Sequence, residues 1–297
     1  MNEYFIGVIA LTGIQLIAML GVSLLTGFTG LYSFGHAGFM AIGGYTSALV
    51  VKYLHIPIFC SVATGVLVAT LVGIAIGYPA LRLKGDYFLI ATLGFGEAVR
   101  QIIEYAQNLT GGAKGLPDVA KAFELPTIIL IDILVIIILV NFLRSTHGRN
   151  CIAIREEETA AQAMGIDITR YKTISLAISC ALTGLSGAMM AHFMQYLHPS
   201  MFGMMVSDML IITVILGGLG SITGTILATC ILVPLPELLR IENIQSWRMV
   251  AYGVIILLIL QFKPSGLYGY KELTFKQIKK YIANLKTRLN RRGKSFD

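Results

Sequence analysis

Residues 4–26 read YFIGVIALTGIQLIAMLGVSLLT and contain no charged side chain. An α-helix of about 20 apolar residues crosses the ~30 Å hydrocarbon core of a bilayer. The residues before this run lack the basic n-region of a cleaved signal peptide, and the run is long enough to span and remain. We therefore expect residues 4–26 to form the first transmembrane helix.

Apolar runs of similar length recur along most of the chain. We expect further spans near residues 36–54, 57–81, 86–106, 126–143, 173–196 and 246–262. The apolar stretch 205–238 is too long for one span, since a straight helix of ~34 residues would run ~50 Å at 1.5 Å per residue. We expect it to break near its glycines into a hairpin or a re-entrant pair. The predicted fold is an all-α, polytopic transmembrane bundle of about 8–9 spans, some broken or re-entrant.

The composition agrees with this class. Of the 297 residues, 56% are hydrophobic and 13% are charged, and the mean hydropathy is +0.75. Soluble domains average about 25% charged residues. We place one membrane domain at residues 1–270. The four cysteines are scattered without paired spacing, so neither a disulfide framework nor a metal site is expected.

The basic residues predict the orientation, because short loops rich in Lys and Arg stay in the cytoplasm. Such residues gather in segment 271–297, in the loop 144–172 and at Arg82 and Lys84. With all three inside, the N-terminus lies outside, together with the segments 108–124, 198–204 and 239–245.

The segment 271–297 has nine basic and two acidic side chains. Its apolar residues recur at spacings of three and four, at Phe275, Ile278, Ile282, Leu285 and Leu289. This pattern predicts a basic amphipathic cytoplasmic tail. The inner leaflet of the lipid bilayer, with its anionic headgroups, is the favoured partner, and an ATP-hydrolysing subunit is the alternative. Nucleic acid is not expected as a partner in this membrane context.

Glycine is dense in residues 27–44 and 217–224. Small residues let helix backbones approach closely in lipid, and this packing is the favoured interpretation. Broken helices that line a substrate path are the alternative, since irregular backbone at membrane depth needs protein or a water-filled cavity around it. Both can hold together. The N-terminus of a half-helix near Gly35 or Gly218 is a candidate for binding a substrate carboxylate.

The cytoplasmic loop at about 145–171 contains IREEETAAQAMG at residues 154–165. Residues 159–164 favour a short helix outside the bilayer that ends at Gly165. Three glutamates would then lie near its N-terminus, where the helix dipole favours negative charge. A solvated connecting helix is the alternative role for this loop.

The pattern Glu-x-Ala-Ala-x-x-x-Gly at residues 158–165 resembles the EAA loop of ABC-importer permeases, the coupling helix that docks on the ATP-hydrolysing subunit. Four longer blocks resemble the branched-chain amino acid permease family, in particular its LivM-type members. They are GFTGLYSFGHAGFMAIGGYTSALV (27–50), LRLKGDYFLIATLGFGEAVRQII (81–103), TGGAKGLPDV (110–119) and ILGGLGSITGTILA (215–228). They occur in the family's order and cover most of residues 20–265.

The resemblance implies the permease subunit of an ATP-driven importer for leucine, isoleucine and valine, working by alternating access in a bacterial inner membrane. It implies as partners a second, homologous permease, two ATP-binding cassette subunits and an external solute-binding protein. The residues that would couple to the ATPase are Arg155, Glu157, Glu158, Ala160, Ala161 and Gly165. The chain has no G-x-x-x-x-G-K-[ST] phosphate loop, so ATP-Mg is expected on the partners, with no cofactor bound here and no enzymatic activity.

Polar residues and glycines inside the spans are candidates for the substrate path: Ser33, Gly35, His36, Glu97, Gly217 and Gly218. A charge near the bilayer centre costs ~2.5–3.5 kcal/mol, so Glu97 suggests a function. Arg100 follows three residues later, and an ion pair between the two is slightly favoured over substrate contact. His36 is evenly balanced between lining the path and packing.

Three further polar residues within the apolar stretches are not assigned to the path. Structural roles near the outer interface are expected for His192 and Asp208, and Asp132 is expected close to the outer end of its span.

Other functions remain as alternatives. Importers of urea or short-chain amides belong to the same family, and selectivity in such importers rests largely with the external binding protein. A passive small-solute channel needs no docking surface for a motor, so the pattern at residues 158–165 argues against it. An intramembrane enzyme is not expected, because the sequence has neither metal-ligand spacing nor a Gly-x-Ser-x-Gly elbow.

Overall fold

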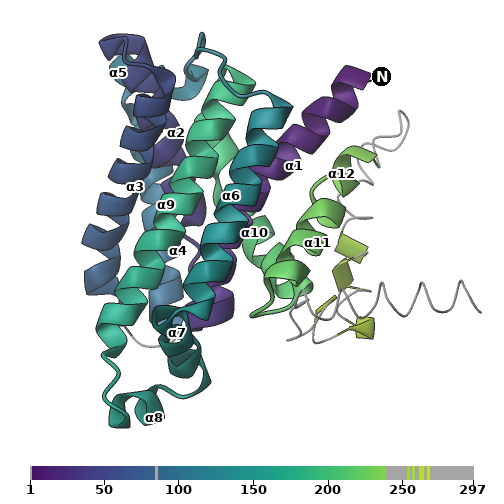
Figure 1. Cartoon of the computed structure of the whole chain (residues 1–297). Coiled ribbons are helices and arrows are strands. Elements are labelled where there is room, and N and C mark those ends of the chain that lie inside the picture. The colour runs from purple at the N-terminus through teal and green to yellow at the C-terminus, as the bar shows by residue number, and fades with distance from the viewer. Residues whose placement is uncertain are drawn as a thin grey trace, which may run out of the picture.

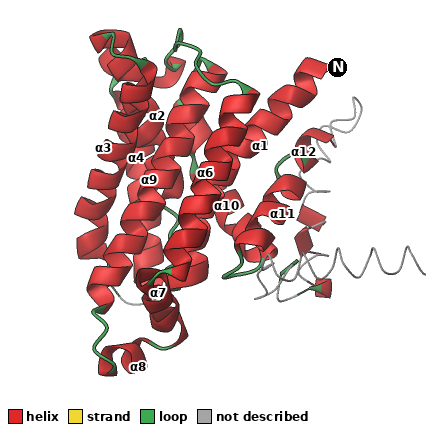
Figure 2. Cartoon of the chain, viewed as in Figure 1, coloured by secondary structure: helices red, strands yellow, loops and turns green. Residues whose placement is uncertain are grey.

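A computed structural model describes residues 2–83, 86–238, 253–254, 256–257, 261–263 and 266–267. Across these residues the regular elements are helices, as predicted (Figure 2). Those long and apolar enough to cross a membrane are Glu3–Phe28, Ile58–Ala80, Leu125–Arg144, Ile168–Met194 and Pro199–Gly217. The predicted span 246–262 lies largely outside the described residues. The segment 239–245 and the tail 271–297 lie wholly outside them.

The long helices begin and end close to the predicted bounds. They are α1 (Asn2–Val22), continued by the π-helical segment η1 (Ser23–Phe28), α2 (His36–Leu54), α3 (Ile58–Ala80), α4 (Asp86–Tyr105), α6 (Leu125–Arg144), α9 (Ile168–Met194) and α10 (Met204–Gly217). Helix α9 begins earlier than predicted, because Asp167 caps it. The Asp167 Oδ1 accepts a hydrogen bond from the Arg170 amide at 3.1 Å, which satisfies one of the first unpaired donors of the helix.

Shorter helices occupy the connections. They are α5 (Gln107–Thr110), η2 (Gly112–Lys114), α7 (Thr146–Glu156), α8 (Glu158–Ala163), η3 (Pro199–Phe202), α11 (Ile222–Leu232) and α12 (Leu235–Leu238). The pair α7 and α8 forms a projection at one end of the bundle (Figure 1). This projection carries the predicted coupling residues.

Helix α9 lies at the centre of the bundle, in contact with α1, α2 and α3 (Figure 1). Glycines bring these helices close together. A Cβ added at Gly44 of α2 would lie 2.9 Å from the Gly187 carbonyl oxygen on α9. A Cβ added at Gly65 of α3 would lie 2.6 Å from the Gly43 carbonyl oxygen. The close-packing interpretation of the glycines is therefore confirmed for this seam between α2, α3 and α9.

Buried polar side chains of α9 join it by hydrogen bonds to α1, to α2 and to the loop 108–124. His192 is fully buried, and its Nε2 lies 2.8 Å from the Ser47 Oγ while its Nδ1 lies 2.8 Å from the Ala120 carbonyl oxygen. Ser186 donates to the Ile14 carbonyl at 2.6 Å. Because buried polar groups are costly without partners, these bonds hold the helices in register. His192 has the structural role expected of it.

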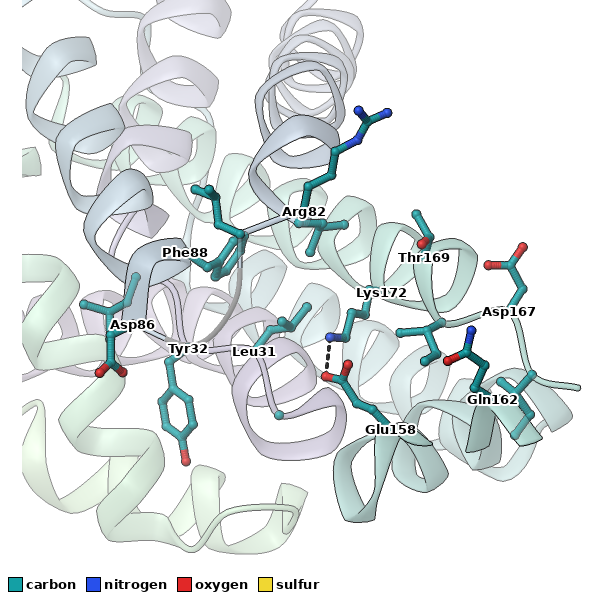
Figure 3. A pocket seen from close by; sticks show the side chains of 16 residues that line it. Leu31, Tyr32, Arg82, Asp86, Phe88, Glu158, Gln162, Asp167, Thr169 and Lys172 are labelled. Carbon is teal, nitrogen blue, oxygen red and sulfur yellow. Dashed lines mark hydrogen bonds and ion pairs between the residues drawn. The ribbon is translucent and has the colours of Figure 1, made fainter. Parts of the chain in front are cut away.

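The two ends of the bundle separate as the basic residues predict. The projection of α7 and α8 lies at one end, and the N-terminus and α5 lie at the other (Figure 1). At the second end, Leu116 and Leu197 form a backbone bridge, which ties the loop 108–124 to the connection before α10. At the first end, Arg82 lies near the start of α9 (Figure 3).

The stretch 205–238 is broken, as predicted. Helix α10 ends at Gly217, the chain turns through residues 218–221, and α11 packs back against α10. The 11 residues of α11 span about 16 Å at 1.5 Å per residue, about half of a ~30 Å hydrocarbon core. Helix α11 therefore has the length of a re-entrant half-helix.

Candidate functional site

The projection begins with α7, which is fixed to the bundle along its length. The Ser145 Oγ caps its first turn by accepting from the Gly148 amide. Cys151 and Ile154 are buried against the bundle. Helix α7 ends at Glu156, and one extended residue separates it from α8. Glu156, expected at the start of the short helix, is thus the last residue of α7.

Helix α8 carries the predicted coupling pattern. Ala161 is buried, whereas Glu157, Glu158 and Ala160 are exposed. The helix ends as predicted, because Gly165 adopts a left-handed φ of +82° that glycine accepts without strain. A Cβ added at Gly165 would meet no heavy atom within 4 Å, so this turn stands free of its neighbours.

An ion pair ties α8 to the bundle. Glu158 bonds to Lys172, whose side chain is largely buried near the start of α9 (Figure 3). A buried lysine needs such a partner, because desolvation penalises its charge. The sequence contains both Glu158 and Lys172, but their spacing along the chain does not indicate that they form an ion pair.

A hollow of about 990 Å³ opens beside this pair (Figure 3). Its walls come from residues 30–32, from residues 81–83 and 86–89, and from residues 158–172. Charges of both signs line it, namely Arg82, Asp86, Glu158, Asp167 and Lys172. An open, mixed-charge recess beside a projecting helix is suited to contact with another protein.

Arg155 points away from the exposed face of the projection. Its Nη1 donates to the Gly27 carbonyl oxygen at 2.7 Å, and its guanidinium pairs with Glu156. Gly27 lies in the π-helical segment that continues α1, and it packs against Gly220 in the turn between α10 and α11. Arg155 is therefore placed apart from the other predicted coupling residues.

The predicted path residues near the start of α2 are buried. Ser33 and His36 are 0% exposed. The His36 Nδ1 lies 2.8 Å from the Ser33 carbonyl oxygen, and its Nε2 lies 2.9 Å from the Ser179 Oγ on α9. Gly35 precedes α2, and a Cβ there would lie 3.0 Å from the Thr92 carbonyl oxygen of α4. In this conformation these residues join α2, α4 and α9.

The two candidate half-helix N-termini are already capped by hydroxyl groups. At α2, the Ala37 amide donates to the Ser207 Oγ at 3.1 Å. At α11, the Gly224 amide donates to the Ser221 Oγ at 3.1 Å. A substrate carboxylate that bound these two amides would have to displace the hydroxyls.

Gly217 and Gly218 lie where α10 ends and turns toward α11. A Cβ at Gly217 would lie 2.7 Å from the Gly224 carbonyl carbon, which shows close packing. Gly218 has a φ of +113°, so the helix breaks here. Close helix packing and a helix break thus occur at adjacent glycines.

Glu97 lies midway along α4 within a chain of charges. Arg100 Nε donates to Glu97 Oε2 at 2.8 Å, and Arg100 Nη1 donates to Glu104 Oε2 at 3.2 Å. The other Glu97 oxygen accepts from the Met204 amide at the start of α10, at 3.2 Å. The predicted pair with Arg100 is confirmed. The second ion pair, between Arg100 and Glu104, was not predicted, although the two residues are four apart on the same helix.

Asp132 is buried against α1. It is 7% exposed, a Cβ at Gly13 would lie 2.7 Å from its Oδ2, and its Oδ1 has no hydrogen-bond partner among the described residues. It lies in the first half of α6, the half nearer the N-terminal end of the bundle. In the part of the chain that the structure describes, no group of three His, Cys, Asp or Glu is placed to hold a metal ion.

Several membrane-length apolar helices, a broken hairpin and a helical projection at the basic end define a multi-pass membrane protein of the permease class. The chain belongs to the family described as branched-chain amino acid transport system / permease component, which it matches over residues 4–260.

Curated relatives agree with this family. The high-affinity branched-chain amino acid transport system permease protein LivM of Salmonella typhimurium is 30% identical, with 88% of this chain and 69% of the relative covered. A probable branched-chain amino acid transport permease protein LivM of Methanocaldococcus jannaschii is 27% identical, with 92% and 95% covered. The permease protein LivH of Salmonella typhimurium is 24% identical, with 92% and 96% covered. No solved structure matches the chain.

Proposed function

We propose that this chain is the membrane-spanning permease subunit of an ATP-driven importer for branched-chain amino acids. The family match over residues 4–260 carries the proposal. It is supported by the projecting helix α8, where Glu158 and Ala160 of the helix and Glu157 just before it are exposed and offer a docking surface to a motor subunit. A passive channel would have no use for this surface. The named relatives are permeases for branched-chain amino acids, so urea and short-chain amides are not favoured.

The assembly follows from the same proposal. The chain pairs with a second, homologous permease, since its relatives include both LivM and LivH proteins. Of the two ATP-binding cassette subunits, one docks at α8 of this chain and the other docks on the partner permease; both bind ATP-Mg, while this chain binds no cofactor and catalyses no reaction. An external solute-binding protein delivers the amino acid at the end that carries α5.

We place the chain in the inner membrane of a bacterium, with about 8–9 spans and a cytoplasmic C-terminus. Support comes from the exposed faces of α3 and α6. Their large exposed side chains are apolar and suit lipid, for example Leu67 and Leu71 on α3 and Leu130 and Leu134 on α6.

Helix α4 differs from α3 and α6 because it exposes charged side chains, and we place the substrate path along this charged side. Glu97 and Arg100 keep 34% and 25% of their side-chain surface exposed. Charges at this depth avoid lipid and face protein or a water-filled cavity. The second permease would supply the other wall. A zwitterionic amino acid needs a cation for its carboxylate and an anion for its ammonium group, and this pair offers both.

Reconstituted transport tests the proposal. The chain, its partner permease and the ATP-binding subunits are placed in sealed proteoliposomes with internal ATP, and the purified binding protein and radiolabelled leucine are added outside. We expect uptake that requires ATP and that is lost when Glu158 and Gly165 are both replaced by alanine, while the membrane subunits still assemble. Leucine that equilibrates without ATP would instead identify a channel. Uptake of labelled urea but not leucine would identify the other substrate class.

The substrate path has its own test. Replacing Glu97 with Gln removes one charge of the pair without changing its size. We expect leucine uptake to fall roughly tenfold to a hundredfold, since a hydrogen bond to a charged group contributes about 1.5–3 kcal/mol. Glu104→Gln is the matched control and should lower uptake less, because Glu104 also bonds to Arg100 but lies near the end of α4. Equal uptake by wild type and Glu97→Gln would remove Glu97 from the path.

A further inference from the structure

The two glycine-rich segments of the sequence meet in space. The first follows α1, where Gly30 has a φ of +76°, and the second lies between α10 and α11, where Gly220 has a φ of +83°. A Cβ added at Gly27 would lie 2.9 Å from the Gly220 amide nitrogen. Two helix breaks that are far apart in the chain therefore form one junction.

Arg155 is inserted into this junction from the coupling projection. Its Nη1 donates to the Gly27 carbonyl oxygen at 2.7 Å. A Cβ added at Gly30 would lie 3.2 Å from the Arg155 Cγ, and one added at Gly220 would overlap the Arg155 guanidinium. Glycine at both positions therefore makes room for this side chain. Arg155 contacts both breaks at once.

A second contact fixes α7 to the same place. The Cys151 Sγ lies 3.2 Å from the Ser175 Oγ of α9, and the Ser175 Oγ lies 2.7 Å from the Thr29 Oγ1. Thr29 is located between the glycines of the first break. A hydrogen-bonded chain therefore connects α7 to this break in addition to Arg155.

Arg155 also borders two hollows. One of about 540 Å³ is shared with Thr26 and Tyr32, and a separate one of about 270 Å³ is shared with Phe28. The exposed docking residues of the projection follow directly after Arg155 in the chain.

We propose that Arg155 is a positioning residue that transmits motion from the docked ATPase subunit to the two broken membrane helices. The proposal rests on the function proposed above and assigns a mechanical role to one side chain. When the docked ATP-binding subunit pulls or releases α8, α7 moves with it. Arg155 then shifts the junction of Gly27 and Gly220, and α1 and the α10–α11 hairpin change their position relative to each other at the membrane boundary.

The experiment compares transport with ATP hydrolysis in the complete reconstituted complex. Arg155→Met keeps an unbranched side chain and removes the charge and its bond to Gly27. We expect this complex to assemble and to hydrolyse ATP at a rate within about twofold of wild type, while leucine moved per ATP falls roughly tenfold or more. Arg155→Lys, which keeps the charge but not the forked geometry, should restore part of the ratio.

Arg149→Met is the matched control. Arg149 lies on the same helix, is exposed, and bonds to Thr146 rather than to either break. Its substitution should leave the ratio of leucine to ATP unchanged. Gly220→Ala should lower the ratio at least as much as Arg155→Met does, because the new methyl group displaces the guanidinium and the φ of +83° is unfavourable for alanine. The double variant should be no worse than Gly220→Ala alone, since both substitutions interrupt the same contact.

Three results would overturn the proposal. Transport and hydrolysis that fall in proportion would place Arg155 in docking alone. An unchanged ratio in both Arg155 variants would remove it from coupling. Failure of both Arg155→Met and Arg155→Lys to assemble would make its role structural. Failure of the wild-type complex to take up leucine with ATP would count instead against the proposed function.

Discussion

The seam between α2 and α9 and the junction around Arg155 use the same residue type for opposite purposes. In the seam, Gly44 and Gly187 lie within helices and let two backbones touch. At the junction, Gly30 and Gly220 have positive φ and interrupt the helices. Glycine density in this membrane sequence thus marks both close helix contacts and helix breaks.

The largest effect is expected in the seam. A methyl group at Gly187 would overlap the Met40 carbonyl oxygen, and backbone cannot move aside as a side chain can. Gly187→Ala should therefore destabilise the bundle by at least about 1–3 kcal/mol, the usual cost of overpacking. Thermal unfolding in detergent and the yield of assembled complex would measure this, with transport per assembled complex unchanged.

Gly7→Ala provides the control for that substitution. Gly7 is also in a helix, but a Cβ there would meet no heavy atom within 4 Å. Alanine is more favourable than glycine inside a helix by roughly 0.5–1 kcal/mol, so stability should stay equal or rise. If Gly187→Ala were as stable as Gly7→Ala, the seam would not depend on close approach.

A smaller effect on stability and a larger one on coupling are expected at Gly30. Alanine there costs about 1–2 kcal/mol for its left-handed backbone and also presses on the Arg155 Cγ at 3.2 Å. Leucine moved per ATP should fall, while the unfolding temperature falls less than in Gly187→Ala. If Gly30→Ala lost as much stability as Gly187→Ala while leucine moved per ATP stayed unchanged, Gly30 would serve helix packing and not coupling.

Gly165→Ala measures the cost of a left-handed backbone for alanine without any clash with a neighbouring residue. Its φ of +82° is close to that of Gly30, but a Cβ at Gly165 would touch nothing. The substitution should cost about 1 kcal/mol in the turn after α8 and weaken binding of the ATP-binding subunit about fivefold. The isolated bundle should unfold as wild type does. A binding titration with the purified ATP-binding subunit measures the first effect, and unchanged affinity would contradict it.

The sequence predicted the long helices and the short coupling helix because both depend on local signals. Apolar length defined the spans, and Gly165 ended α8 as a glycine after a short helix does. The break at 217–221 followed from a stretch too long for one span. These features require no knowledge of what lies opposite each residue.

The candidate path was harder to predict, because its residues are defined by partners far along the chain. His36 looked suited to a path beside Ser33 and glycine, but Ser179, on another helix, completes its hydrogen bonds. The resemblance implies a coupling role for Arg155 from its place in the loop before the motif, and nothing in the sequence indicates that it reaches Gly27. Only the folded chain brings these groups together.

The smallest effect concerns the chemical labelling of Cys151, which tests whether α7 stays packed against the glycine junction. Burial raises the pKa of the Cys151 thiol above its ordinary value. A raised pKa leaves less thiolate at neutral pH, and labelling by a maleimide requires both thiolate and access. In detergent, Cys151, which is buried, should not be labelled near pH ~7. Cys151 should react only after denaturation, or slowly as the pH rises. Rapid labelling of Cys151 in the folded protein would mean that α7 detaches readily from the bundle. A detached helix could not transmit motion to the glycine junction.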